Sequence, residues 1–184
     1  QGLVRITQGS GTYVEDFTVD LVLGKRTRHQ QCLAQAGLRG SLVVLQAQTT
    51  RATAALAKAL QVPARSPLLA LRVRGDAEGQ PLHISERYFP LPRFENLAAV
   101  VRETGSITAG FTAHGVADYT RRESRITAEL PSPEVAAQLR QTTSRPVLQV
   151  ESLNVDLAGT PIEWARAWFA GDRVKLTIDH DEHA

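Results

Sequence analysis

Two arginines on one predicted strand are the residues best suited to bind an anion. In residues 69–74, apolar side chains alternate with Ala70, Arg72 and Arg74. This period of two is typical of a half-buried strand, so both guanidinium groups are expected on one face. Guanidinium groups bind carboxylate and phosphate oxygens through paired N–H donors. The same pattern also occurs on solvated sheet faces, and the residues alone leave that alternative open.

Residues 105–108, Gly-Ser-Ile-Thr, form a second group suited to an anion. Ser106 is a good N-cap, so a short helix is predicted from there to residue 113. The hydroxyls of Ser106 and Thr108 and the first backbone N–H groups would lie at the positive end of that helix. Together with the arginines they predict a pocket for a tetrahedral oxyanion. The alternative is that Ser106 only caps the helix.

The arginines lie in a predicted hairpin, residues 68–89, with a three-residue loop at 77–79 that uses Gly79 in the left-handed conformation. In that register Arg72 pairs with Ile84, and Glu86 lies on the same face as Arg72 and Arg74. A carboxylate that faces the interior needs a partner. The candidates are Arg72 and an amine of a ligand.

The hairpin is predicted to occur twice. Residues 155–169 repeat the frame of residues 75–89 at a constant offset of 80, and the helix-like segment before each hairpin is repeated with the offset slipping by one. The matched pairs are Asp76/Asp156, Gly79/Gly159, Pro81/Pro161, Leu82/Ile162 and Phe89/Phe169. This pattern indicates an internally duplicated unit whose two halves share one sheet. The alternative is that good hairpin residues are used twice by chance.

The other elements follow from the periodicity and the caps. Strands are predicted at residues 13–23, 41–48, 116–129, 147–156, 161–170 and 174–178, and helices at 27–36, 51–60, 94–104 and 133–139. Ser132 and Pro133 are expected to open the last of these helices. On the strand at 116–129, Tyr119 and Arg121 share one face, and either could reach the pocket or lie on an exposed strand.

Length and composition favour one α+β domain, and the predicted hairpins and helices indicate mainly an antiparallel sheet with flanking helices. The chain has 184 residues, of which 42% are hydrophobic, and a net charge of +2 that does not by itself indicate a nucleic-acid surface. Its single cysteine, Cys32, allows no internal disulfide. No apolar run approaches the ~20 residues that cross a bilayer. A soluble cytoplasmic protein without a membrane partner is expected.

Residues 4–14 predict two short strands around the Gly-Ser-Gly run at 9–11. The run Gly-Ser-Gly-Thr-Tyr-Val at 9–14 resembles the wing hairpin that closes the winged helix-turn-helix of GntR-type transcription regulators. The resemblance implies that residues 1–14 are the remnant of that wing and its linker. The reader helices are expected to precede them in the natural protein.

Residues 15–179 resemble the UTRA effector-binding domain of the HutC branch of that family, which is similar in fold to chorismate lyase. The motifs that carry the resemblance are residues 25–28, 71–74, Asp76 with Gly79 and Pro81, Glu86, 89–90, 105–108, 159–163 and 172–173. Four details look most like the branch that regulates phosphonate metabolism: residues 26–28, 106–108, 118–121 and 172–180.

The resemblance implies a set of ligand-binding residues. An anionic group would contact Arg28, Arg72, Arg74, Ser106 and Thr108, and its polar or amine part would contact Glu86 and Glu163. Phe169 stands where the family often has a tyrosine. That departure removes a hydroxyl donor and leaves the far end of the ligand open.

The implied function is effector binding and homodimerisation in a bacterial transcription regulator. A phosphonate or phosphate ester would control binding of operator DNA by the N-terminal domain. No cofactor is expected. A metal at His180 and His183 is less expected than a solvated polar tail at 180–184. The alternatives are a lyase-like enzyme acting on an anionic substrate, which lacks an assignable acid or base, and a domain that only dimerises.

Overall fold

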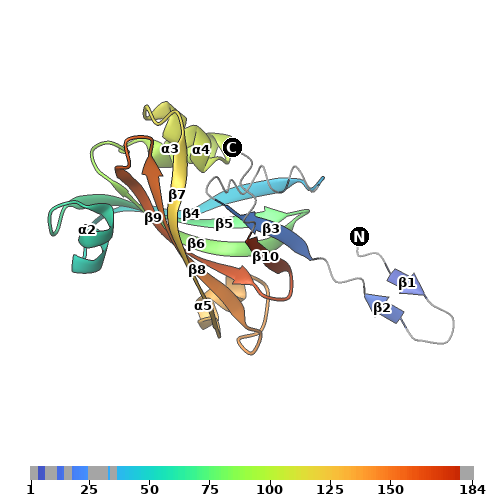
Figure 1. Ribbon diagram of the computed structural model, residues 1–184. Helices are drawn as coiled ribbons and strands as arrows, with labels where there is room; N and C mark the ends of the chain where they lie inside the picture. The colour runs from blue at the N-terminus through green and yellow to red at the C-terminus, as the bar shows by residue number, and fades with distance from the viewer. Residues whose placement is uncertain (1–3, 7–11, 15–17, 25–32, 34–36, 179–184) are drawn as a thin grey trace.

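A six-stranded antiparallel sheet forms the centre of the computed structural model, which describes residues 4–6, 12–14, 18–24, 33 and 37–178 (Figure 1). The strand order is β4-β5-β6-β9-β8-β7. The strands are β4 (Gly40–Arg51), β5 (Pro67–Ala77), β6 (Gln80–Pro90), β7 (Tyr119–Glu129), β8 (Val147–Asp156) and β9 (Pro161–Ala170). The predicted α+β class with a mainly antiparallel sheet is confirmed.

Helices cover both faces of this sheet. They are α2 (Ala54–Leu60), α3 (Leu97–Thr104), α4 (Ile107–Ala113) and α5 (Pro133–Gln138). Helices α3 and α4 pack on the face that carries Leu71, Val73 and Phe89, here called the α3–α4 face. Helices α2 and α5 pack on the opposite face, here called the α2–α5 face, against Leu68 and Ile84 respectively.

The caps predicted from the sequence are confirmed. Ser106 Oγ accepts the N–H of Ala109 at 3.2 Å, and Ser132 Oγ accepts the N–H of Val135 at 3.3 Å. The helix expected at 51–60 begins later than predicted, because β4 continues to Arg51 and Thr53 caps α2. Such caps satisfy backbone donors that the first helical turn leaves unpaired.

The first hairpin turns more tightly than predicted. Its loop has two residues, Glu78 and Gly79, with positive φ values of 49° and 77°, and not three. A bulge between Gly75 and Asp76 accompanies the turn, and Arg72 pairs with Glu86 and not with Ile84. The register differs from the prediction by two residues. The side chains therefore keep their faces, and Arg72, Arg74 and Glu86 do share one.

The predicted duplication is confirmed by the topology. Elements β4-α2-β5-β6 recur as β7-α5-β8-β9, and the antiparallel pair β6–β9 joins the two halves at the middle of the sheet (Figure 1). At that junction Glu86 pairs with Arg166, its equivalent 80 positions later. The second hairpin has its own bulge, between Asn154 and Val155, at the point equivalent to the first.

Four shorter strands complete the described chain. Strands β1 (Val4–Ile6) and β2 (Thr12–Val14) pair antiparallel, as the predicted N-terminal hairpin requires. Strands β3 (Val19–Leu23) and β10 (Val174–Ile178) pair in parallel. A single strand over 13–23 is therefore wrong, because β2 and β3 belong to different sheets. The predicted helix at 27–36 lies outside the described residues, Leu33 excepted.

An aromatic cluster fixes α3 and α4 to the sheet. Phe89, Phe94 and Phe111 are each fully buried, and their ring centroids lie 5.7–5.9 Å apart in edge-on contacts. Phe111 also contacts Tyr119 of β7 at 4.8 Å. Edge-to-face pairs at these distances add to the free energy gained by burying the rings.

Asp156 closes the second hairpin. Its carboxylate accepts the N–H groups of Ala158 at 3.1 Å and Thr160 at 2.9 Å, and pairs with Arg93 at 2.9 Å. Burial raises the pKa of Asp156, but the Arg93 guanidinium and the two N–H groups outweigh it. They hold the pKa of this carboxyl below its ordinary value.

We expect Asp156→Ala to lower the free energy of unfolding by about 1–2 kcal/mol at neutral pH, through the loss of these contacts. The folded pKa lies below the unfolded one. The contribution of Asp156 is therefore complete above the unfolded pKa of about 4 and is lost as the pH falls through the folded pKa. Urea unfolding from neutral pH downward should show the difference between variant and parent shrinking in acid. A difference that stays constant with pH would contradict this account, and Glu123→Ala, in an exposed ion pair, is the control.

Candidate functional site

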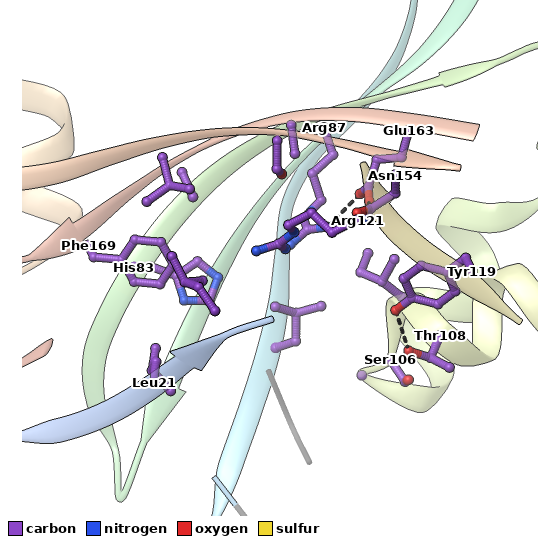
Figure 2. A pocket seen from close by; sticks show the side chains of 18 residues that line it. Leu21, His83, Arg87, Ser106, Thr108, Tyr119, Arg121, Asn154, Glu163 and Phe169 are labelled. Atoms are coloured by element: carbon purple, nitrogen blue, oxygen red, sulfur yellow. Dashed lines mark hydrogen bonds and ion pairs between the residues drawn. The ribbon is translucent and has the colours of Figure 1, made fainter. Parts of the chain in front are cut away.

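A cavity lies on the α3–α4 face, between the sheet, the start of α4 and strand β3 (Figure 2). Its volume is about 940 Å³, which includes solvent at its mouth. The polar side chains that line it are His83, Arg87, Ser106, Thr108, Tyr119, Arg121, Ser152, Asn154 and Glu163. The apolar ones are Leu21, Leu23, Leu42, Ile107, Val150, Ala165, Ala167 and Phe169.

A buried polar network holds the middle of the cavity. Glu163 on β9 is only 1% exposed, and its two carboxylate oxygens accept hydrogen bonds from Arg87 of β6 and Asn154 of β8. Neighbouring strands of the sheet bring these residues together. A buried carboxylate is tolerated when it is paired and hydrogen-bonded in this way. The network therefore fixes the Arg87 guanidinium at the cavity wall.

Strand β7 and helix α4 supply the next group of polar side chains. The hydroxyls of Thr108 and Tyr119 lie 2.9 Å apart and are hydrogen-bonded. Arg121 follows Tyr119 by two residues, so it faces the same side of β7 and also lines the cavity. Figure 2 shows Arg87 and Arg121 between the sheet and the Ser106–Thr108 end of α4. Two guanidinium groups and several hydroxyls therefore converge on one space.

The opposite end of the cavity is mainly apolar. His83 contacts Phe169 with ring centroids 5.0 Å apart, and Leu21 of β3 lies near both (Figure 2). Phe169 has no hydroxyl to donate a hydrogen bond to a ligand, in contrast to the tyrosine that the family often has at this position. This end offers surface for the body of an organic molecule more than for a second charged group.

Four of the sequence-predicted site residues line this cavity: Ser106, Thr108, Glu163 and Phe169. Arg28 lies outside the described residues.

The expected pocket that joins Arg72 and Arg74 to the start of α4 is wrong, because both arginines lie on the α2–α5 face. Arg72 pairs with Glu134 of α5 at 2.7 Å, and Arg74 pairs with Asp76 at 2.8 Å. The hydrogen bonds that the Arg74 guanidinium donates to the Asp76 carboxylate raise the pKa of Arg74. Alternation along β5 separates two faces, and α3 and α4 cover the one that carries Leu71 and Val73.

Glu86 also lies on the α2–α5 face, in a shallow depression lined by Gln46, Gln48, Arg72 and Tyr88. Burial and the nearby Glu86 carboxylate raise the pKa of the Tyr88 phenol. The register continues this row across the sheet as Arg72, Glu86, Arg166, Glu151 and Arg125, with alternating sign. Such a row is typical of a solvated sheet face with cross-strand charge pairs.

Arg87 is the charged cavity residue that the sequence reasoning missed, and the polar residues His83, Ser152 and Asn154 were missed as well. Arg87 pairs with Leu71 across the hairpin, so it is a charged side chain on the face to which β5 contributes Leu69, Leu71 and Val73. That mismatch was the available signal. Arg121 and Tyr119 do reach the cavity, one of the two alternatives that the sequence left open.

Two other findings bear on the class of site. Within the ranges that the structure describes, no group of three or more His, Cys, Asp or Glu side chains could hold a metal ion. In the same ranges, none of the helices is long and apolar enough to span a bilayer.

Known proteins resemble this chain along most of its length. The model of the UTRA domain family matches residues 35–175. HTH-type transcriptional regulator RB1450 of Rhizobium meliloti is 36% identical over 97% of this chain and 74% of its own length. The crystal structure of PhnF from Mycobacterium smegmatis is similar with a TM-score of 0.85 and 23% identity, over 97% of this chain and 79% of that one. The ligand-binding domain of a GntR-family regulator from Bordetella bronchiseptica has a TM-score of 0.65 at 24% identity, over 73% of this chain and 85% of that one.

An antiparallel α+β fold with a charged cavity that opens to solvent is the architecture of a small-molecule-binding domain. The chain belongs to the UTRA domain family, as the effector-binding domain of a GntR-family transcription regulator. Regulators of this family bind DNA through an N-terminal domain and respond to a small molecule. Because its relatives are transcription regulators, the chain is not an enzyme, and the lyase alternative is set aside.

Proposed function

We propose that this domain senses a small anionic metabolite, a phosphonate or phosphate ester, in the cavity on the α3–α4 face. The observation that carries the proposal is the convergence of Arg87 and Arg121 with the hydroxyls of Ser106 and Thr108. Guanidinium and hydroxyl donors are the groups that tetrahedral oxyanions accept hydrogen bonds from. The phosphonate branch of the HutC subfamily is part of this proposal, supported by the sequence motifs given above.

Binding would act on DNA through a shift between two arrangements of the regulator. The cavity draws its lining from both halves of the duplicated sheet and from β3, so an effector bound there contacts all three. The β1–β2 hairpin supports the assignment of residues 1–14 to the wing and linker of a winged helix-turn-helix. Because a transcription regulator acts on DNA, we place the protein in the cytoplasm.

We propose that the regulator is a homodimer. Strands β4 and β7 are the two edges of the six-stranded sheet, and both expose apolar side chains, Val43 and Leu45 on one and Ile126 on the other. Exposed edge strands pair readily with another chain. Light scattering during size-exclusion chromatography would give the mass of a dimer if this holds and of a monomer if it does not.

The test of the effector site is calorimetric titration of phosphate, sulfate, methylphosphonate, aminoethylphosphonate and sugar phosphates into the parent chain and into Arg121→Gln. A ligand that contacts Arg121 should bind on the order of ten- to a hundredfold more weakly to the variant, since charge-assisted hydrogen bonds are lost. In thermal unfolding, a ligand at a hundred times its dissociation constant should stabilise the parent by about 2.7 kcal/mol.

The matched control is Arg72→Gln, which removes an arginine from the opposite face of the sheet. We expect its affinity to equal that of the parent. If Arg72→Gln lost binding while Arg121→Gln kept it, the effector would bind on the α2–α5 face and the cavity assignment would be wrong. If none of these anions bound specifically, dimerisation would be the main role of the domain.

A further inference from the structure

The two ends of the cavity differ in their chemistry. Arg87, Arg121, Asn154 and Glu163 lie at its polar end, close to the start of α4 (Figure 2). The apolar end is formed by side chains from three separate strands: Leu21 on β3, Val150 on β8, and Ala167 and Phe169 on β9. A ligand that fills the cavity would therefore meet charge at one end and hydrocarbon at the other.

The apolar end is continuous with the protein core. Leu21, Val150, Ala167 and Phe169 are all at least nine-tenths buried and belong to one cluster that also contains Val174 of β10. His83 is the polar side chain at this end, packed against the Phe169 ring. Water here has few polar partners, so an apolar group that replaces it gains free energy.

A small inorganic anion uses only part of this space. Phosphate or methylphosphonate would fit at the polar end and leave the apolar wall in contact with water. Eight apolar residues line the cavity beside its polar groups, and sites for organic ligands are typically lined in this way, mostly by apolar side chains with a few polar groups. The polar and apolar ends together therefore fit a ligand that is larger than an inorganic anion.

Building on the proposed function, we infer that the effector is an amphiphilic organic anion. Its single anionic group lies at Arg87 and Arg121, and an apolar substituent of several carbons packs on Leu21, Val150 and Phe169. Alkyl or aryl phosphonates have this chemistry, and so do the corresponding carboxylates. Glu163 is already paired with Arg87 and Asn154, so a ligand amine is not required to balance it.

The test is calorimetric titration of a series of n-alkylsulfonates, from methanesulfonate to octanesulfonate, into the full chain. Sulfonates keep one negative charge at all working pH values, so only the apolar length changes. Affinity should rise roughly fourfold per added CH₂ until the apolar end is full. Parallel series of alkylphosphonates and alkanoates then identify the preferred anionic group.

Three variants locate the binding. Arg121→Gln should weaken every member of the series by a similar factor. Val150→Ala and Ala167→Val alter only the apolar wall, so each should reduce the gain per CH₂ while methanesulfonate binds as before. Two variants are used because either could be unstable, and thermal unfolding without ligand shows which are folded. Arg72→Gln and an alkyltrimethylammonium ion of the same chain length control for adsorption elsewhere.

The outcomes separate this inference from the proposed function. Methanesulfonate and octanesulfonate could bind the parent with equal affinity and both lose binding in Arg121→Gln. That result would overturn the amphiphilic ligand but support the anion site. If Arg121→Gln left the affinities for sulfonates, phosphonates and alkanoates unchanged, both the amphiphilic ligand and the proposed anion site would be overturned. Equal binding of the alkyltrimethylammonium ion would also overturn the inference, because the charge would then not matter.

Discussion

Glu163→Ala is expected to lower the free energy of unfolding by about 3–5 kcal/mol. The substitution leaves the partly buried Arg87 guanidinium without its carboxylate and the Asn154 amide without its acceptor. Breaking one side of a buried ion pair costs this much because the remaining charge stays away from water. Urea unfolding followed by circular dichroism measures the loss, and the melting temperature should fall by about 2–4 °C per kcal/mol for a chain of this size.

Two further variants test whether the loss comes from the pair. Glu163→Gln keeps a hydrogen-bond acceptor and should lose less. The double variant Arg87→Met with Glu163→Leu removes both charges, and we expect it to be more stable than Glu163→Ala alone. Strict additivity of the two single changes would mean that Arg87 and Glu163 do not interact.

Phe111→Ala should have an effect of similar size, about 3–5 kcal/mol. Phe111 is fully buried and contacts the rings of Phe89, Phe94 and Tyr119. Its loss leaves a cavity between α4 and the sheet, and it removes the ring against which Tyr119 packs. Urea unfolding gives the stability change, and titration with the best anion gives the effect on the ligand site.

The matched comparisons are Phe111→Leu and Ile126→Ala. Leucine fills most of the space, so the loss should be about 1–2 kcal/mol. Ile126 is 41% exposed on an edge strand, so its replacement should change stability by about 0.5 kcal/mol or less. If Phe111→Ala destabilised no more than Ile126→Ala, the aromatic cluster would not be what holds α4 in place.

Local signals were sufficient to predict most elements of this fold. Gly79 and Gly159 mark the two hairpin turns, and Ser106 and Ser132 cap their helices, because each depends on residues only a few positions away. The offset of 80 residues showed the duplication for the same reason, since equivalent turns need equivalent residues. The predicted starts of α2 and α3 were each three residues too early, because the strand before α2 and the loop before α3 extend further than expected.

The site required information that no local pattern contains. Alternation on β5 showed that Arg72 and Leu71 face opposite sides, but which side the later helices α3 and α4 cover depends on tertiary packing. The two-residue turn and the bulge at Gly75 each shifted the register by one residue, so the partner of Arg72 was predicted incorrectly. Arg87 belongs to the cavity only because β6, β8 and β9 are neighbours in the sheet.

The parallel pairing of β3 with β10 has a mechanical consequence. The pair runs in register from Val19 opposite Val174 to Leu23 opposite Ile178, and the N–H of Val19 also donates to Arg173 O at 2.8 Å. Tension applied along β3 from its N-terminal side would load these hydrogen bonds in shear, all together, and not one after another. Leu21 and Leu23 also line the cavity, so a ligand bound there would contact the same strand that carries this load.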